Sequence, residues 1–286
     1  MIRILVLGAT GLLGNAMLRF FADSPGFHAV GTARTLTGAA QRLRPDLQQR
    51  LVAVQDVLDD TALEVLLGRT TPHVIINCIG LVKQLPASDV PVAAIAVNAL
   101  LPHQLARAAA RTGARLVHVS TDCVFSGGRG GYTEADPPDA QDLYGLSKRL
   151  GEVTAAPAIT LRTSIVGHEL GEPHGLVGWF LAQRGVTRGY RRAVFSGLPT
   201  VELARVIRDY VIPAPDLSGL HHVAAEPIAK FDLLRLVARE YGSATELIPV
   251  DEPVIDRSLD GSAFSALTGY VAPAWPRLVQ AMREFG

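Results

Sequence analysis

The first fourteen residues constrain the fold of this chain more than any other segment. Ile2–Leu7 is an unbroken apolar run, which is typical of a strand buried on both faces of a parallel sheet. It leads into a GxxGxxG sequence, Gly8 to Gly14, which opens the segment Leu12–Ala22 with apolar residues at helical spacing. A strand, a glycine-rich turn and a helix in this order begin a nucleotide-binding βαβ unit. We therefore predict an α/β fold, a Rossmann-type doubly wound parallel sheet.

The alternation of strand and helix continues along the chain, with short loops, as a doubly wound sheet requires. One helix start is predicted at Thr61, where Glu64 three residues later completes a capping box. The other predicted strands are His28–Thr32, Leu51–Gln55, Val74–Cys78, Arg115–Ser120 and Ile159–Ser164, and the predicted helices are Thr61–Leu67, Val92–Arg111, Leu143–Ala155, Val201–Tyr210 and Phe231–Tyr241.

Charge and cysteine content exclude several classes of protein. The 286 residues include 27 basic and 27 acidic side chains, so we expect no nucleic-acid or membrane-surface partner. The two cysteines, Cys78 and Cys123, form no CxxC pair, which indicates neither a metal site nor a disulfide framework and favours a reducing cytoplasm. The apolar start is too short for a signal peptide, and no segment has the length and apolarity of a membrane span. Lysine is rare, which draws attention to Lys83, Lys148 and Lys230.

The glycine-rich turn predicts a dinucleotide site. Gly8 permits the tight turn, Gly11 lets the backbone approach a pyrophosphate, and Gly14 lets the helix pack on the strand. The phosphates would then lie against the positive end of the helix. The same turn contains Thr10, Leu12 and Leu13.

The end of the second strand indicates which nicotinamide cofactor would bind. Gly31-Thr32-Ala33-Arg34 contains no acidic residue for a ribose 2′-hydroxyl, whereas Arg34 suits a 2′-phosphate. We therefore predict NADP(H), the alternative being that Arg34 is a solvated surface residue. The ends of the later strands supply further candidate cofactor contacts, namely Asp56, Val57, Cys78, Ile79 and Gly80. Asp56 either accepts a hydrogen bond from the adenine or caps a turn.

We expect residues 1–166 to form this NADP-binding Rossmann domain. After about Gly167 the strand–helix rhythm weakens, and glycine, proline and histidine become denser. Residues 167–286 are predicted to form a smaller, C-terminal substrate-binding lobe, with some segments returning to the main domain.

Three residues carry the candidate chemistry. Thr121 lies at the carboxyl end of the fifth strand, and Tyr144 and Lys148 are four residues apart, so they share one helix face. A nearby ammonium favours the phenolate, so Lys148 is expected to lower the Tyr144 pKa and also to hold the nicotinamide ribose, while Thr121 hydrogen-bonds a carbonyl. Asn98 lies in the predicted helix Val92–Arg111, where it is either a buried polar packing residue or part of a proton relay to Lys148.

Longer motifs around these residues resemble the extended short-chain dehydrogenase/reductases, and within them the dTDP-4-dehydrorhamnose reductase family. Ser120–Gly127, STDCVFSG, is similar to the family's STDYVFDG, and the likeness continues through Tyr132–Pro138 to Tyr144-Gly145-Leu146-Ser147-Lys148. It is weaker at Gly197–Thr200, which is similar to a GxPT loop. The resemblance implies Thr121, Tyr144 and Lys148 as the catalytic groups and Trp179 near the sugar.

Departures from that family concern the sugar rather than the hydride chemistry. Cys123 stands where the family has a tyrosine, Ser126 replaces an aspartate, and the loop from Asn77 to Gln84 differs. The pattern is similar to relatives that reduce UDP-linked 2-acetamido-2,6-dideoxy-4-keto sugars. Arg184, Arg188, Arg191 and Arg192 either bind a diphosphate or form a solvated face. The candidate substrate contacts are Lys83, Asp122, Cys123, Trp179, Arg188 and Arg191.

The combined expectation is a reductase that uses NADPH to reduce the 4-keto group of a dTDP- or UDP-linked 6-deoxy-hexulose, for surface polysaccharide precursors. Two alternatives stay open: a nucleotide-sugar 4-epimerase of the same superfamily, and a non-catalytic NADP-binding regulatory subunit. The expected partner is a nucleotide-sugar substrate, and a homodimer is left open.

Overall fold

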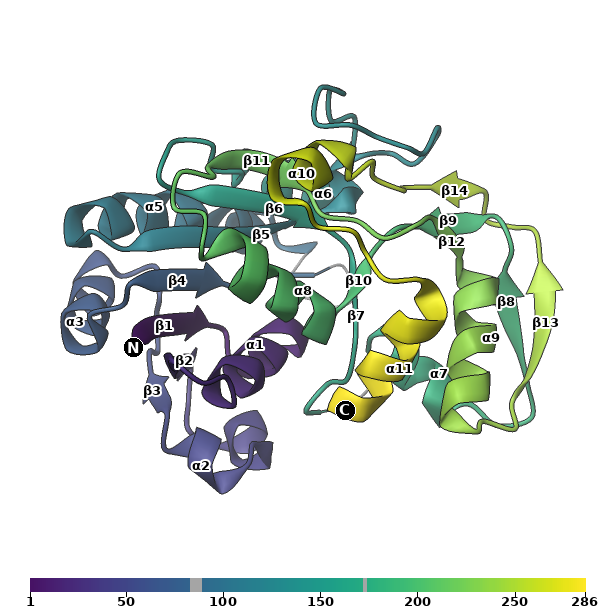
Figure 1. Cartoon of the computed structure of the whole chain (residues 1–286), viewed down its shortest axis with the longest axis horizontal. Helices are drawn as coiled ribbons and strands as arrows, with labels where there is room; N and C mark the ends of the chain where they lie inside the picture. The colour runs from purple at the N-terminus through teal and green to yellow at the C-terminus, as the bar shows by residue number, and fades with distance from the viewer. Residues whose placement is uncertain (83–88, 172–173) are drawn as a thin grey trace.

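The computed structural model describes residues 1–82, 89–171 and 174–286. Its main sheet has seven parallel strands in the order β11-β6-β5-β4-β1-β2-β3 (Figure 1). The strand order runs outward from β1 in both directions, which confirms the predicted doubly wound Rossmann-type sheet. The strands are β1 (Ile2–Leu7), β2 (Phe27–Ala33), β3 (Leu51–Ala53), β4 (Val74–Asn77), β5 (Arg115–Thr121), β6 (Ile159–Thr163) and β11 (Gly219–His222).

Helices cover both faces of the sheet, which explains the unbroken apolar run of β1. Side chains alternate between faces along a strand, and Val6 joins the core under α1 and α8, whereas Leu7 joins the core under α3 and α5. No position of β1 beyond its first residues can therefore be polar without being buried. These helices are α1 (Leu12–Ala22), α3 (Asp60–Thr70), α5 (Leu101–Thr112) and α8 (Thr200–Val206).

The helix predicted over Val92–Arg111 contains a wider π-helical turn. α4 (Pro91–Ala94), the π-helix η3 (Ile95–Leu100) and α5 follow one another without a break. In a regular α-helix the ring of Pro102 would collide with the carbonyl of Asn98 four residues earlier, and Pro102 has no N–H to donate. The π turn relieves this conflict, and it contains Asn98.

Two predicted helix ends were wrong. The N-cap of α3 is Asp59, whose Oδ1 accepts hydrogen bonds from the Thr61 and Ala62 N–H groups at 2.8 and 3.2 Å. Aspartate is as good a cap as threonine, so the capping box at Thr61 does not form. α6 (Leu143–Leu150) ends well before Ala155, because the residues after it bond to neighbouring strands.

Part of the C-terminal region joins the main domain. β11 pairs with β6 as an outer strand of the main sheet. α8 lies against α1 on one face of that sheet (Figure 1). The division at residue 166 stays a prediction. In the part of the chain that the structure describes, no helix is long and apolar enough to cross a bilayer. The remaining elements are η1 (Gly38–Arg42), α2 (Pro45–Gln48), η4 (Asp122–Val124), β7 (Ile165–Val166), α7 (Leu176–Ala182), β8 (Val186–Tyr190), β9 (Ala193–Phe195), β10 (Leu198–Pro199), η5 (Ile207–Val211), β12 (Ile228–Ala229), α9 (Lys230–Tyr241), β13 (Glu246–Val250), β14 (Ile255–Asp256), α10 (Ser262–Thr268) and α11 (Trp275–Phe285).

Candidate active site

The glycine-rich turn is packed so closely that side chains would not fit in it. Gly8 has a φ of 79°, and a Cβ added to Gly14 would collide with the carbonyl oxygen of Gly8. Thr32 of β2 holds the turn: the Gly8 N–H donates to its Oγ1 at 3.2 Å, and the Ala9 N–H to its carbonyl at 2.8 Å. These contacts with β2 define the conformation of the turn.

The first turn of α1 is open to an anion. Within the described residues, its N-cap Gly11 supplies no side-chain cap, and the first turn carries no acidic side chain. Gly11 is exposed and Thr10 and Leu12 are half-buried, whereas the Leu13 side chain lies in the core, so Leu13 has only its backbone to offer. This arrangement fits the phosphates of a dinucleotide, which bind helix N-termini through backbone N–H groups.

The end of β4 lies against the same turn. A Cβ added to Gly8 would stand 3.0 Å from Ile79 Cγ1, and the half-buried Cys78, Ile79 and Gly80 continue along this edge. Burial raises the pKa of the Cys78 thiol, and the Lys148 ammonium partly opposes that shift. The structure therefore brings the end of β4 close to both the turn and Lys148.

The residues predicted near the adenosine half lie at the ends of β2 and β3. Arg34 immediately follows β2, is exposed, and bonds to no acceptor in the described part of the chain. Asp56 lies three residues beyond β3, and its Oδ1 accepts from the Leu58 N–H at 2.9 Å, which is the capping alternative. Val57 is half-buried beside it.

Thr121, Tyr144 and Lys148 meet at the carboxyl end of β5. Thr121 is 7% exposed, and its hydroxyl hydrogen-bonds the Tyr144 phenol. Lys148 is 5% exposed, and its Nζ donates to the Val119 carbonyl at 2.9 Å. A glycine makes the approach possible, because a Cβ on Gly145 would collide with the Cys123 carbonyl oxygen. α6 can therefore begin directly against the segment that follows Thr121.

Burial dominates the electrostatics of these groups. It raises the Tyr144 pKa above its ordinary value, and the hydrogen bond from Thr121 only partly opposes this. It also lowers the pKa of Lys148 to about 8, against the field of Glu152. Burial thus outweighs the other influences on the Tyr144 pKa, because a low-dielectric site disfavours both charged forms. The expectation that Lys148 favours the phenolate stays a prediction. The phenol is held protonated, as a proton donor must be.

Asn98 connects two parts of the site. Its Oδ1 accepts from the Leu81 N–H at 2.8 Å, and its Nδ2 donates to the Leu81 carbonyl at 3.0 Å and to Ser147 Oγ at 3.2 Å. Both N–H groups are thus engaged by the loop after β4 and by α6, which favours the packing interpretation. The relay to Lys148 stays a prediction.

The predicted substrate residues lie on several different elements. Asp122 is buried next to Thr121, and burial raises its pKa, while Cys123 is half-buried. Trp179 is 38% exposed on α7 and Arg188 is exposed on β8. Arg191 is exposed and forms a two-pronged ion pair with Asp251, at 2.9 Å for each hydrogen bond. Lys83 lies outside the described residues.

Sequence reasoning missed several groups near the centre. Lys230 and Arg257 lower the pKa of Asp122, so both cations lie near its carboxyl group, and Arg257 Nε also donates to the Phe125 carbonyl at 2.9 Å. Lys230 stood out in the sequence only as a rare lysine, and the position of Arg257 late in the chain carries no local signal. The buried Glu152 was also missed, although its position four residues after Lys148 would have placed it on the same helix face.

His168 and His221 have structural partners. His168 Nε2 lies 2.8 Å from the Tyr241 hydroxyl, and His221 Nε2 lies 2.9 Å from the Ser218 carbonyl. Among the residues that the structure describes, no three His, Cys, Asp or Glu side chains are placed to hold a metal ion.

The curated relatives that this chain resembles include two kinds of protein. A methionine adenosyltransferase 2 subunit beta of Xenopus tropicalis is 34% identical over 275 residues, which cover 88% of this chain and 76% of the relative. A dTDP-4-dehydrorhamnose reductase of Mycobacterium tuberculosis is 31% identical over 249 residues, which cover 82% of this chain and 80% of the relative.

A solved structure and a family model cover nearly the whole chain. The dTDP-4-dehydrorhamnose reductase of Bacillus anthracis, in complex with NADP, superposes with a TM-score of 0.80 over 99% of both chains at 20% identity, a likeness that shows the fold. The model of the family described as RmlD substrate binding domain matches residues 2–275. With its Rossmann-type sheet and this match, the chain belongs to the RmlD substrate binding domain family.

Proposed function

We propose that this chain is an NADPH-dependent reductase of the 4-keto group of a nucleotide-activated 6-deoxy-hexulose. The observation that carries the proposal is the meeting of the buried Thr121 and Lys148 with the half-buried Tyr144 at the carboxyl end of β5, the end of the sheet where the glycine-rich turn also lies. Open α/β sheets bind their ligands at the carboxyl ends of the strands. The named reductase relative supports the reaction, and the exposed Arg34 supports NADP(H) over NAD(H).

Each of the three residues has a separate task in this reaction. Bound NADPH would supply the hydride to C4 of the sugar. The Thr121 hydroxyl orients the carbonyl oxygen, and Tyr144, held protonated by burial, gives its proton to the alkoxide that forms there. Lys148, fixed by the Val119 carbonyl, holds the nicotinamide ribose and supports the phenolate that Tyr144 leaves behind. Burial of Thr121 and Lys148 and partial burial of Tyr144 limit the access of water to the new charge.

The proposed substrate is dTDP- or UDP-linked. Asp122 and Cys123 follow Thr121 directly and are proposed to face the sugar, with Trp179 stacking nearby. Arg188, with Lys230 and Arg257 closer to Asp122, is proposed to neutralise the diphosphate. The product would serve as a cytoplasmic precursor of surface polysaccharide.

A second candidate function is a cofactor-binding regulatory subunit. The 34% identity to a methionine adenosyltransferase 2 subunit beta favours it, since that name describes a subunit of another enzyme. The meeting of Thr121, Tyr144 and Lys148 favours the reductase, because a subunit without turnover has no chemical need for a proton donor one helical turn from an ammonium.

NADPH oxidation by the purified chain separates these candidates. The purified chain would be tested with a panel of dTDP- and UDP-linked 4-keto-6-deoxy sugars. We expect it to consume one NADPH for each sugar molecule that it reduces. An epimerase would interconvert sugars without net NADPH consumption. A regulatory subunit would bind NADPH, oxidise none of it with any sugar, and bind a methionine adenosyltransferase catalytic subunit in a pull-down.

The homodimer stays a prediction, for which the helices next to the site offer a surface. Leu146 and Leu150 of α6 and Val92 and Ile95 of the neighbouring α4 and η3 are exposed apolar side chains. Such a patch suits a symmetric contact with a second copy. Sedimentation should show a dimer that Leu146→Glu converts to a monomer; a wild-type monomer would contradict it.

A further inference from the structure

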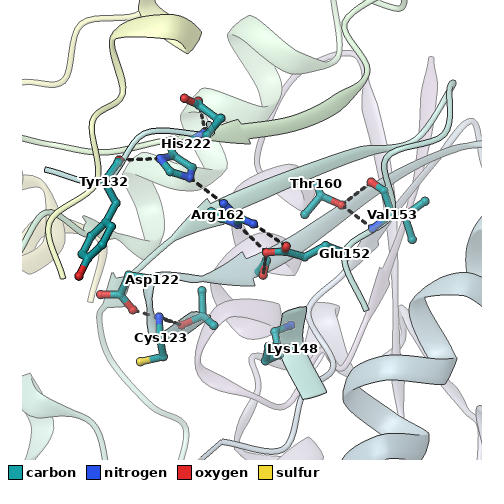
Figure 2. Close-up of polar contacts among 12 residues, drawn as sticks. Asp122, Cys123, Tyr132, Lys148, Glu152, Val153, Thr160, Arg162 and His222 are labelled. Carbon is teal, nitrogen blue, oxygen red and sulfur yellow. Dashed lines mark hydrogen bonds and ion pairs between the residues drawn. The ribbon is translucent and has the colours of Figure 1, made fainter. Parts of the chain in front are cut away.

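A buried ion pair between Arg162 and Glu152 lies near Lys148 (Figure 2). Arg162 of β6 and Glu152, just past α6, have side chains only 5% and 7% exposed. The guanidinium Nε and Nη2 each lie 2.7 Å from one carboxylate oxygen, which is the two-pronged geometry of strong charge-assisted hydrogen bonds. Taking both charges out of water is costly, so the remaining bonds of the pair decide what it does for the protein.

Glu152 fastens the end of α6 to β5. Ser120 Oγ donates to Glu152 Oε1 at 2.8 Å, and Ser120 directly precedes Thr121. Lys148, one turn earlier than Glu152, bonds the Val119 carbonyl at 2.9 Å. Side chains from α6 and its end therefore hold two successive residues of β5, immediately before the proposed carbonyl-binding hydroxyl.

Arg162 connects the pair to the C-terminal part of the chain. Its Nη1 donates to His222 Nε2 of β11 at 3.2 Å, since an arginine has only donors. His222 must then carry its proton on Nδ1, which lies 3.0 Å from the Tyr132 carbonyl and donates to it. The backbone N–H of His222 donates to Glu134 Oε1 at 2.7 Å. Burial lowers the His222 pKa, which suits this neutral form.

We propose that Glu152 and Arg162 are positioning residues that hold α6 against β5, so that Tyr144 and Lys148 keep their place relative to Thr121. The inference rests on the proposed function, because it assigns the pair a task in the same reaction. Misplacing a catalytic group by about 1 Å costs on the order of a hundredfold in rate, so a looser contact between α6 and β5 should lower kcat. Through His222, the last strand of the main sheet takes part in this positioning.

Ser120→Ala tests the proposal with a small change. It removes the one hydroxyl that joins β5 to Glu152 and leaves the ion pair itself intact. We expect kcat to fall about tenfold. The Kd for NADPH should rise about fivefold because Lys148 is less firmly placed, the scale of one lost hydrogen bond. The KM for the sugar should stay as in wild type.

Thr160→Val is the matched control. Thr160 is also buried, and its hydroxyl bonds the N–H and carbonyl of Val153, the residue next to Glu152, at 3.1 and 2.7 Å (Figure 2). This contact does not reach the residues around Thr121. We expect a lower Tm, from two unpaired backbone groups, with kcat and NADPH Kd within about twofold of wild type.

The outcomes separate the positioning role from the proposed function. Wild-type kcat and Kd in Ser120→Ala would overturn the positioning role, and so would an equal loss in Thr160→Val, which would mean that any loosening near Glu152 has the same effect. A wild-type chain that binds NADPH but reduces no sugar would contradict the reductase, while the two Kd values would still decide the positioning role. A wild-type chain that binds no NADPH would overturn both.

Discussion

Two regions of the molecule differ in how firmly their side chains are held. One is the catalytic edge, which is the carboxyl end of the main sheet with Thr121, Tyr144 and Lys148, and the other is β8 with Arg188 and the Arg191 that follows it. Thr121 and Lys148 are buried and bonded to fixed partners. Arg188 is exposed on a small two-stranded sheet, and Arg191 pairs with Asp251 at the surface. Ordering long exposed side chains on binding costs conformational entropy, whereas the buried groups are in place beforehand. We therefore expect changes at the catalytic edge to act on kcat, and changes at β8 to act on KM.

The largest effect should follow from Tyr144→Phe. The substitution keeps the ring and removes only the proton, so kcat should fall about a hundredfold or more, the scale for losing a positioned acid. NADPH binding, measured by fluorescence titration, should stay close to wild type. A folded Tyr144→Phe chain that reduces the sugar at nearly the parent rate would mean that Thr121, Tyr144 and Lys148 have a structural role only. The contrast with β8 would then have no chemical basis.

Lys148→Met should damage both binding and turnover. We expect the Kd for NADPH to rise about tenfold at pH 7, the scale of a lost charge-assisted hydrogen bond. Because burial lowers the Lys148 pKa to about 8, the ammonium is present below that pH and lost above it. Wild-type affinity for NADPH should therefore weaken as the pH rises through about 8. Titrations of Lys148→Met should lack this step; identical pH curves for the two proteins would refute the role of the ammonium.

Arg34→Ala should act on the cofactor alone. Losing a charge-assisted contact with a 2′-phosphate should weaken NADPH binding about tenfold. NADH has no such phosphate and serves as the internal control, so its Kd should not change. A wild-type chain that prefers NADH, or an equal loss for both cofactors, would leave Arg34 as a solvated surface residue.

The smallest effects are expected at β8. Arg188→Ala should raise the KM for the nucleotide sugar a few-fold with little change in kcat, because this binding is shared by ground and transition states. Arg191→Ala should do less, since Asp251 already occupies its guanidinium. Steady-state kinetics of the two variants decide the point, and a loss confined to kcat would show that β8 is part of the chemistry after all.

Local signals predicted what local interactions determine. Ile2–Leu7 and Leu12–Ala22 form the strand and helix expected at those residues, because a doubly buried strand, a glycine turn and an amphipathic helix are all encoded within a few residues. Thr121, Tyr144 and Lys148 were predicted in the same way, from a strand end and a helix face, and the structure brings them together, while their catalytic role stays a prediction.

Long-range contacts account for what the sequence alone missed. α6 stops at Leu150 because Glu152 and Val153 bond to Ser120 and Thr160 on the two adjacent strands. The Tyr144 pKa rises rather than falls because the surrounding fold removes water from the phenol. Periodicity and spacing carry no information about either effect.

The most direct test of the account follows a deuterium from the cofactor to the sugar. NADPH deuterated at the transferable C4 position would be incubated with the chain and a 4-keto-6-deoxy nucleotide sugar, and the product examined by mass spectrometry and NMR. The account predicts one deuterium at C4 of the sugar for each NADPH oxidised, and about a hundredfold less in the same time with Tyr144→Phe. NADPH that binds the chain but is not oxidised with any sugar of the panel would contradict the central claim and identify a cofactor-binding subunit instead.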